Sequence, residues 1–415
     1  MKLKLFLMTA ATMALVSSCS SDDVIKDNAE ANAITFSVTA NNASRSNSMY
    51  CNNNMPDNFQ VWAEVDGKSY FAGEQYDRDN STSKYLPHGG EYRYWPSTAV
   101  RFYALKDYEQ GTFNWATPFT PTLTGFTPAT TADAQKDFIY AYNSGVRGAG
   151  DKNGAKTQEL NFRHALSQIV FKAQKNNSKI YVEIEGVTIK NVASQGTFTF
   201  PQGDNFTTDN FVNHENANST PEAKHRSGLG NWTFTEGDPA VDYSLKGSYS
   251  VSVVNSGNPV VLKKDVLTNL TNNEGEGLDN AASYKKSFML MPQTNEVYYN
   301  EAAITGQTCT YFLLNCRIWN LTSDENNFVA ANEVNLWGKE IKDGDGKVTG
   351  YDYKPLLVPV KINWEQGKKY IYTFIFNDKG NGGYEPETGK DVLIPIELNV
   401  TVDDFALGKD EPEQL

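Results

Sequence analysis

Short alternations of apolar and polar residues recur along most of the chain. The first places Ile34, Phe36 and Val38 two residues apart, which predicts a short strand with one buried face. Later alternations follow at intervals of roughly ten residues, and turn signals such as Asp66-Gly67 separate them. No amphipathic pattern of helical period runs beyond about ten residues. The pattern therefore predicts an all-β protein built from β-sandwiches.

A polar, glycine-rich stretch at 144–157 interrupts the strand-like segments and is the clearest linker in the sequence. It predicts an N-terminal β-sandwich over 46–157 and a C-terminal β-sandwich over 158–415. A second break at 175–178 is the alternative boundary. The second region is large for one sandwich, so we expect long loops to decorate it.

The N-terminus has the pattern of a signal peptide. Lys2 and Lys4 precede one apolar run at 5–16, which is too short to span a bilayer. Ser residues then lead into Cys19, as in the site where bacterial lipoproteins are cut and acylated. We therefore expect 1–18 to be a lipoprotein signal peptide and Cys19 to carry the lipid; ordinary cleavage beside an incidental cysteine is the alternative.

Composition and charge exclude several classes of function. The chain has 37 basic and 50 acidic residues, a net charge of −13, so we expect no nucleic-acid partner. The four histidines show no metal-ligand spacing, and His164 lies in an apolar strand, where a packed core histidine is expected. The Asp-Gly-Asp-Gly stretch at 343–346 predicts a tight hairpin turn rather than a calcium loop. We therefore expect no metal, no cofactor and no enzymatic activity.

Three cysteines remain after Cys19, namely Cys51, Cys309 and Cys316. An oxidising compartment permits a disulfide, but an odd count forbids complete pairing within one chain. Cys309 and Cys316 are seven residues apart, which puts their side chains on opposite faces of a continuous strand. We expect buried free thiols.

Six motifs, in order along the chain, are similar to those of the fimbrillin family of Bacteroidota, the type V pilins with their tip and accessory relatives. They are the first strand followed by Arg45, YWP at 94–96 with FYA at 102–104, DFIYA at 137–141, LNFRHALSQIVFKAQ at 160–174, FMLMPQ at 288–293 and WEQGKKYIYTFIF at 364–376. The acidic Ser-Ser-Asp-Asp stretch after Cys19 also resembles the signal that sends lipoproteins to the cell surface in such bacteria.

This resemblance implies two tandem transthyretin-like (immunoglobulin-like) β-sandwich domains and a cell-surface fimbria. It implies a lipoprotein of the outer membrane, whose pro-segment 19–45 is removed when an Arg-specific surface protease cuts after Arg45. Ile34, Phe36 and Val38 would then leave a groove that a strand from another fimbrial subunit fills, by donor-strand exchange. The implied partners are other fimbrial subunits, the protease and an adhesion target on a host or another bacterium.

One departure from the family pattern concerns the C-terminus. The last strand expected, at 392–402, is followed by an acidic tail with Pro412 and little alternation, which makes a poor donor strand. A tip or accessory subunit therefore fits better than a stalk subunit, although 392–402 could itself be the donor. The alternative function is a surface glycan-binding lipoprotein outside any pilus; Tyr92, Tyr94 and Trp95 are its candidate aromatic residues, for which core packing is the commoner role.

Overall fold

The computed structural model of the protein consists of β-strands and short 3-10 turns. It describes residues 33–40, 55–115, 120–145, 157–201, 229–234, 246–254, 257–271, 287–297, 308–322, 324–377, 383–388, 390, 392 and 396–404. The 3-10 turns are η1 (His88–Gly90), η2 (Ala132–Ala134), η4 (Glu325–Asn327) and η5 (Ala330–Asn332). None of the described segments forms a helix with the length and hydropathy that a bilayer crossing requires. The prediction of an all-β chain is confirmed.

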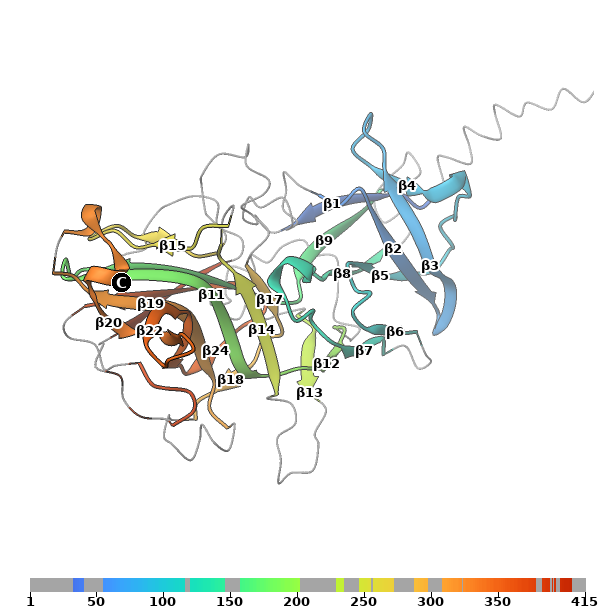
Figure 1. Ribbon diagram of the computed structural model, residues 1–415. Helices are drawn as coiled ribbons and strands as arrows, with labels where there is room; N and C mark the ends of the chain where they lie inside the picture. Colours follow the sequence, from blue (N-terminus) through green and yellow to red (C-terminus); the bar gives the residue numbers. More distant parts are fainter. Residues whose placement is uncertain are drawn as a thin grey trace, which may run out of the picture.

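Seven strands of the first half are hydrogen-bonded in a closed path, in the order β1-β4-β3-β2-β5-β8-β9 (Figure 1). They are β1 (Phe36–Ala40), β2 (Asn58–Val65), β3 (Lys68–Arg78), β4 (Tyr85–Pro87), β5 (Val100–Lys106), β8 (Ile139–Gly145) and β9 (Gln158–His164). The sequence predicted a sandwich of two sheets here. β1 closes the path between the ends of the other six strands, because it pairs with β4 on one side and with β9 on the other. Their inward side chains form one apolar core.

The strand after the predicted linker belongs with the strands before it. β9 begins at Gln158 and pairs with both β8 and β1, so hydrogen bonding continues the barrel to His164. β8 extends to Gly145, and 146–156 lies outside the described residues. The division into two domains at 157/158 stays a prediction.

The second half is a β-sandwich of two sheets. One sheet contains β16 (Thr268–Asn269), β10 (Ser167–Lys175), β25 (Lys368–Phe376), β26 (Ile396–Asp404) and β17 (Phe288–Leu290). The other contains β14 (Gly247–Ser252), β11 (Ile180–Val192), β19 (Tyr311–Asn320), β20 (Val334–Trp337), β15 (Val260–Val261) and β23 (Lys354–Pro359). Their facing side chains form a second, larger core. The described part of the last strand, β26, overlaps the strand that the sequence predicted at 392–402, and 393–395 lie outside the described residues.

A four-stranded sheet joins the two halves. It contains β6 (Thr112–Asn114) and β7 (Thr122–Phe126) from the first half, and β12 (Gly196–Thr199) and β13 (Asn231–Phe234) from the second. Its order is β13-β12-β7-β6. A third apolar core, containing residues from both halves, lies beneath it. This junction sheet, as we call it, is continuous across the middle of the molecule.

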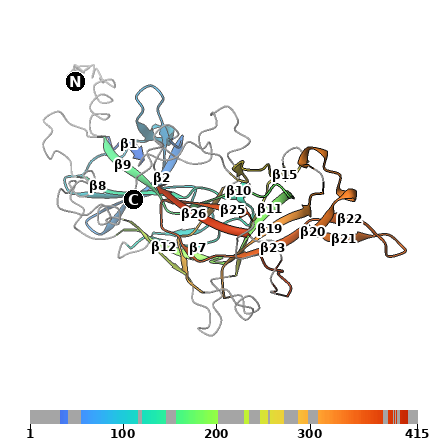
Figure 2. The same cartoon turned by 90° about the vertical axis from the view of Figure 1, so that its left-hand side faces the viewer.

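Two short two-stranded pairs complete the fold. β18 (Thr294–Asn295) pairs with β24 (Ile362–Asn363), and β21 (Lys339–Lys342) pairs with β22 (Val348–Asp352). The β21–β22 arm extends from the end of the molecule far from β1 (Figure 2). The prediction of a tight turn at 343–346 is confirmed, because Asp343 accepts backbone hydrogen bonds from Asp345 and Lys347 there.

The two described cysteines match the prediction of buried free thiols. Cys309 and Cys316 are both free and buried, and burial raises the pKa of the Cys316 thiol well above its usual range. Cys51 lies outside the described residues. His164 is also buried, with Nδ1 2.8 Å from Oδ1 of Asp137, as expected for a packed core histidine.

Candidate functional site

β1 is the strand that closes the barrel. Phe36 pairs with Tyr85 of β4 in an antiparallel bridge. On the other side β1 runs parallel to β9, in a register that begins with Phe36 opposite Gln158 and ends with Ala40 opposite Phe162. Without β1, β4 and β9 would become two free edges of an open six-stranded sheet.

The residues just before β1 are also tied down by their backbone. The amide of Ile34 donates to the carbonyl of Arg93 at 2.7 Å, and the amide of Gln158 donates to the carbonyl of Thr35 at 2.8 Å. The sequence placed this strand at 34–39, whereas regular pairing covers 36–40. Ile34 and Thr35 therefore make single backbone hydrogen bonds at the end of the barrel and do not belong to the β1–β9 ladder.

The apolar side chains of this segment point into the barrel. Ile34 and Phe36 are fully buried, and Val38 is half-buried against the same core. The ring of Phe36 lies 4.7 Å from that of Tyr76 and 5.2 Å from that of Phe102, both in edge-on contact. Edge-on aromatic pairs contribute beyond the area that they bury, so Phe36 is the main side-chain anchor of β1.

Two tyrosines of the same barrel core differ in whether their hydroxyls have a hydrogen-bond partner. Tyr85 donates to the carbonyl of Pro56 at 2.6 Å, and burial raises the pKa of its phenol to about 12. Tyr76 is fully buried, and no described residue accepts from or donates to its hydroxyl. Burial, first of all, raises the pKa of the Tyr76 phenol well above its usual range. A buried hydroxyl without a partner costs about 1–3 kcal/mol.

The aromatic wall around Phe36 is the part of the site that sequence reasoning missed. It is built from β2, β3, β5 and β9, and its members are Phe59, Tyr76, Phe102 and Phe162. Their alternating pattern marks each as a buried strand residue, but no local signal says which strands surround Phe36. The sequence also predicted two processing residues, Cys19 and Arg45. Both lie outside the described residues.

The three aromatic residues proposed for sugar binding do not form one exposed platform. Trp95 is buried in the barrel core, with its ring 5.6 Å from that of Phe102. Tyr94 is exposed, and its carbonyl accepts from the hydroxyl of Tyr70. The core-packing interpretation therefore holds for Trp95.

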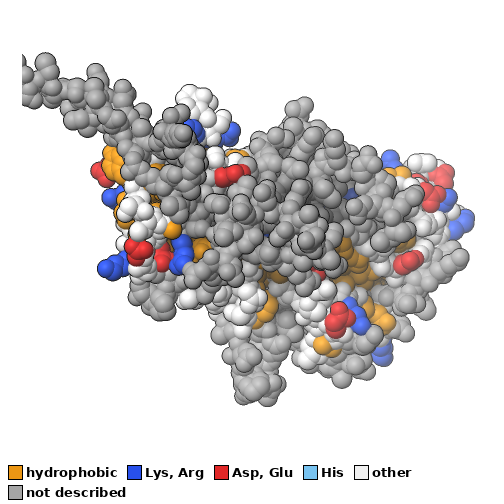
Figure 3. All heavy atoms as spheres, turned by 180° about the vertical axis from the view of Figure 1, so that it is seen from behind, with side chains coloured by type: hydrophobic (Ala, Val, Ile, Leu, Met, Phe, Trp, Pro, Cys, Tyr) orange, Lys and Arg blue, Asp and Glu red, His pale blue; other side chains and the backbone are white. Residues whose placement is uncertain are grey.

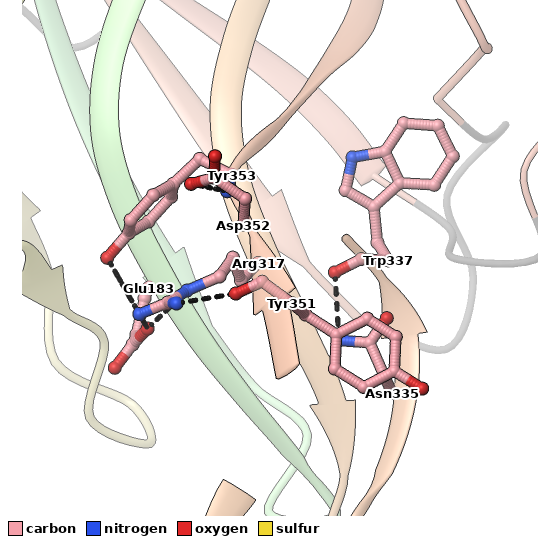
Figure 4. A network of polar contacts seen from close by, with 7 residues as sticks. All are labelled: Glu183, Arg317, Asn335, Trp337, Tyr351, Asp352 and Tyr353. Atoms are coloured by element: carbon pink, nitrogen blue, oxygen red, sulfur yellow. Dashed lines mark hydrogen bonds and ion pairs between the residues drawn. The ribbon is translucent and has the colours of Figure 1, made fainter. Parts of the chain in front are cut away.

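A polar network on the second half has a structural role. Arg317 donates to Oε2 of Glu183 through Nε at 2.9 Å and Nη2 at 2.6 Å, and through Nη1 to the carbonyl of Tyr351 at 2.8 Å (Figure 4). Its guanidinium also lies 4.2 Å from the ring of Tyr353. These contacts tie the β22–β23 connection to the sheet. Among the described residues no group of three or more His, Cys, Asp or Glu could hold a metal ion.

The surface is mixed in charge. Seen from the side opposite to Figure 1, basic and acidic side chains are interspersed at both ends of the molecule (Figure 3). On the part of the described surface that this view shows, there is no basic stripe of the kind that a nucleic-acid partner requires.

The comparisons with known proteins find a fimbrillin-like family and fimbrial proteins. A family model described as fimbrillin-like matches residues 38–401. Among solved structures, a fimbrial protein from Bacteroides vulgatus is 11% identical and aligns over 88% of this chain and 98% of its own, with a TM-score of 0.46. The tip fimbrial protein Mfa3 from Porphyromonas gingivalis, with a C-terminal truncation, is 7% identical over 89% of this chain and 98% of its own, with a TM-score of 0.36. No curated protein matches the chain.

Proposed function

The chain belongs to the fimbrillin-like family, and from that premise we propose that it is a non-enzymatic fimbrial subunit in which β1 is removed and replaced by a strand of a neighbouring subunit. The family places it in a cell-surface fimbria, where it contacts other subunits. The observation that carries the proposal is that β1, from the N-terminal segment, closes a barrel whose other six strands come from 58–164.

The geometry of β1 supports its replacement rather than its simple loss. Its removal would leave the edge of β9 unpaired and would uncover the aromatic wall around Phe36. Unpaired backbone and exposed apolar surface are both unfavourable in water. A new strand restores both at once, because its amides pair with the edge and its side chains fill the cavity.

Processing of the N-terminus provides the trigger in this proposal. Cys19 carries the lipid that holds the subunit at the outer membrane, and an Arg-specific surface protease cuts after Arg45. The cut separates β1 from the rest of the chain and also breaks the link to the lipid. The released segment 19–45 contains two basic and four acidic residues, so the cut changes the net charge only from −15 to −13 and adds no repulsion. The loss of the strand itself, and not charge repulsion, therefore drives assembly.

The site also defines the strand that it accepts. A replacement in the register of β1 runs parallel to β9 and places its central inward residue where Phe36 lies. That position is bordered by the rings of Tyr76 and Phe102, so a large apolar side chain fits there and a charged one does not.

The C-terminal strand favours a tip or accessory role. β26 pairs with β25 along its whole length, from Ile396 opposite Phe376 to Asp404 opposite Lys368. A strand that is paired in this way within its own sandwich supports a subunit that accepts a strand without giving one. A stalk subunit, with β26 as the donor, is the competing role.

The test removes β1 and returns it as a peptide. The chain without signal peptide and lipid is treated with an Arg-specific protease, and hydrogen exchange is followed at the β9 amides. We expect release of the N-terminal segment and faster exchange from Gln158 to Phe162, and an Arg45→Ala variant to keep both segment and protection. The synthetic peptide AITFSVTA, residues 33–40, should restore protection, whereas the same peptide with Phe36→Asp should not. Unchanged β9 exchange after loss of the segment would refute the proposal.

A further inference from the structure

The outer face of the junction sheet has a regular composition that the assembly role does not explain. Each of its four strands presents two outward residues that are Thr or Asn, on either side of one inward apolar residue. The triplets are Thr112-Phe113-Asn114, Thr122-Leu123-Thr124, Thr197-Phe198-Thr199 and Asn231-Trp232-Thr233. The eight outward side chains are exposed or half-buried, and the four inward ones pack into the third core.

The register of the sheet arranges these side chains in rows. Asn231 lies opposite Thr199, Thr199 opposite Thr122, and Thr122 opposite Asn114, so one row crosses all four strands. With strands about 4.8 Å apart, this row is about 14 Å long. In the second row Thr233 lies opposite Thr197, and Thr124 opposite Thr112, with a register shift between the two pairs. The result is a face of hydroxyl and amide groups, in which Asn114 Nδ2 already donates to Thr124 Oγ1 at 2.8 Å.

The chemistry of this face indicates the kind of partner. None of the eight side chains is charged, although 21% of the residues of the chain are charged. A polyanion or polycation therefore gains no ion pair on it. Hydroxyls and amides both donate and accept hydrogen bonds, and each Thr adds a methyl group beside its hydroxyl. A neutral sugar polymer offers the same mixture of hydroxyls and C–H groups at a repeating spacing.

The platform is also rigid and accessible. The inward residues Phe113, Leu123, Phe198 and Trp232 hold the strands from below, and Trp232 additionally donates to the carbonyl of Ala165 at 2.7 Å. Binding groups fixed on strands lose little conformational freedom when they bind. In Figure 1 the junction sheet is drawn well below β1, so the two features lie in different parts of the molecule.

We propose that the outer face of the junction sheet is a binding surface for a neutral polysaccharide, with Thr122 and Thr199 at its centre. Each hydrogen bond exchanged with water contributes little, so a single site binds weakly. Many fimbriae on one cell, each with its own copy of the chain, would raise the overall affinity by avidity. The face acts in the uncut chain as well, so the proposal does not depend on strand replacement.

The test uses the uncut chain without signal peptide and lipid in affinity gel electrophoresis. Dextran, mannan and galactomannan are the neutral probes, and polygalacturonate is the charged control. We expect at least one neutral probe to retard the protein and polygalacturonate not to. The double variant Thr122→Val with Thr199→Val keeps shape and strand propensity and removes two central hydroxyls. It should weaken retardation about fivefold or more, because two hydrogen bonds are lost.

Two further variants separate recognition from folding. Thr188→Val, on β11 of another sheet, makes the same chemical change and should leave binding as in the parent. Thr122→Ser with Thr199→Ser keeps the hydroxyls and should retain most of the binding. Retardation by none of the neutral probes, or equal retardation of the double Val variant, would overturn the proposal. Dimers in sedimentation that disappear in that variant would also overturn it, because the occupant would then be a second copy of the chain.

Discussion

The strands nearest the two ends of the described chain, β1 and β26, differ in what holds them. β1 is short; its first residue, Phe36, and Ile34 just before it are fully buried in the barrel. β26 pairs with β25 over nine residues, yet Val400 and Val402 are 43% and 52% exposed. Both strands are paired through their backbones, but β1 buries the apolar side chains at its start in the barrel, whereas in β26 Ile396 is buried and the later valines are exposed.

Backbone hydrogen bonding and side-chain burial are two separate ways in which a strand is held. A ladder of backbone hydrogen bonds can be exchanged for bonds to water at little net cost, since each contributes only about 0.5–1.5 kcal/mol. A buried aromatic side chain has no such substitute in water. A segment whose departure exposes a core needs a replacement of matching shape, which is the requirement that the proposed strand exchange places on β1.

The largest expected effect comes from emptying the Phe36 position. Phe36→Ala should destabilise the uncut chain by about 3–5 kcal/mol, because it leaves a cavity among aromatic rings. Val402→Ala in β26 should change the free energy of unfolding by only about 0.5 kcal/mol, since that side chain is half exposed. Denaturant unfolding measures both. Similar losses in the two variants would break the comparison.

A smaller change in the free energy of unfolding, of opposite sign, is expected at Tyr76 in the same barrel core. Tyr76→Phe removes a buried hydroxyl for which no described residue is a partner, so it should stabilise the uncut chain by about 1 kcal/mol. Tyr85→Phe is the matched control: it removes the hydrogen bond to Pro56 and should destabilise by about 1 kcal/mol. Thermal unfolding of both variants distinguishes them, and a destabilising Tyr76→Phe would show that its hydroxyl does have a partner.

The smallest effect concerns the polar contacts that precede β26. Glu385 accepts from Nζ of Lys354 at 2.6 Å and from Thr388 at 2.9 Å, and the first of these contacts chiefly lowers the pKa of its carboxyl below 4.5. A lowered pKa in the folded state means that the contribution is present above about pH 4.5 and is lost as pH falls through the folded value.

We expect Glu385→Gln to lower stability by about 0.5 kcal/mol at pH 7 and the gap to the parent to shrink as the pH falls through the lowered pKa of Glu385. The hydrogen exchange of β1 should be the same in both proteins at either pH, because its contacts are apolar. A gap that stays constant with pH would show that the ion pair does not anchor this segment.

The sequence predicted strands well and their partners poorly. The alternation of Ile34, Phe36 and Val38 indicates a strand with one apolar face, and that part needs only local information. Its parallel partner, β9, lies more than a hundred residues away, and no local pattern selects it. The glycine-rich stretch at 144–157 suggested a domain boundary, although the strand that follows it pairs within the first half.

The junction sheet shows a second reason for failure. Its strands are three to five residues long, and an outward row of Thr and Asn resembles loop composition when it is read locally. The inward residues Phe113 and Trp232 reveal a strand only once the cores of both halves are present to receive them. Short strands of this kind are stabilised by tertiary packing rather than by their own propensity.

The pairing of β1 with β9 also sets an order of events during folding. Thr35 and Thr157, whose hydroxyls lie 3.2 Å apart, are separated by 122 positions in the chain. In a chain made from its N-terminus, β2, β3, β5 and β8 are all present before β9, the parallel partner of β1. Local hairpins form early, and a long parallel closure comes late. We therefore expect the six strands from 58–164 to pair with one another before β1 docks, so that the groove for β1 forms before it is first filled.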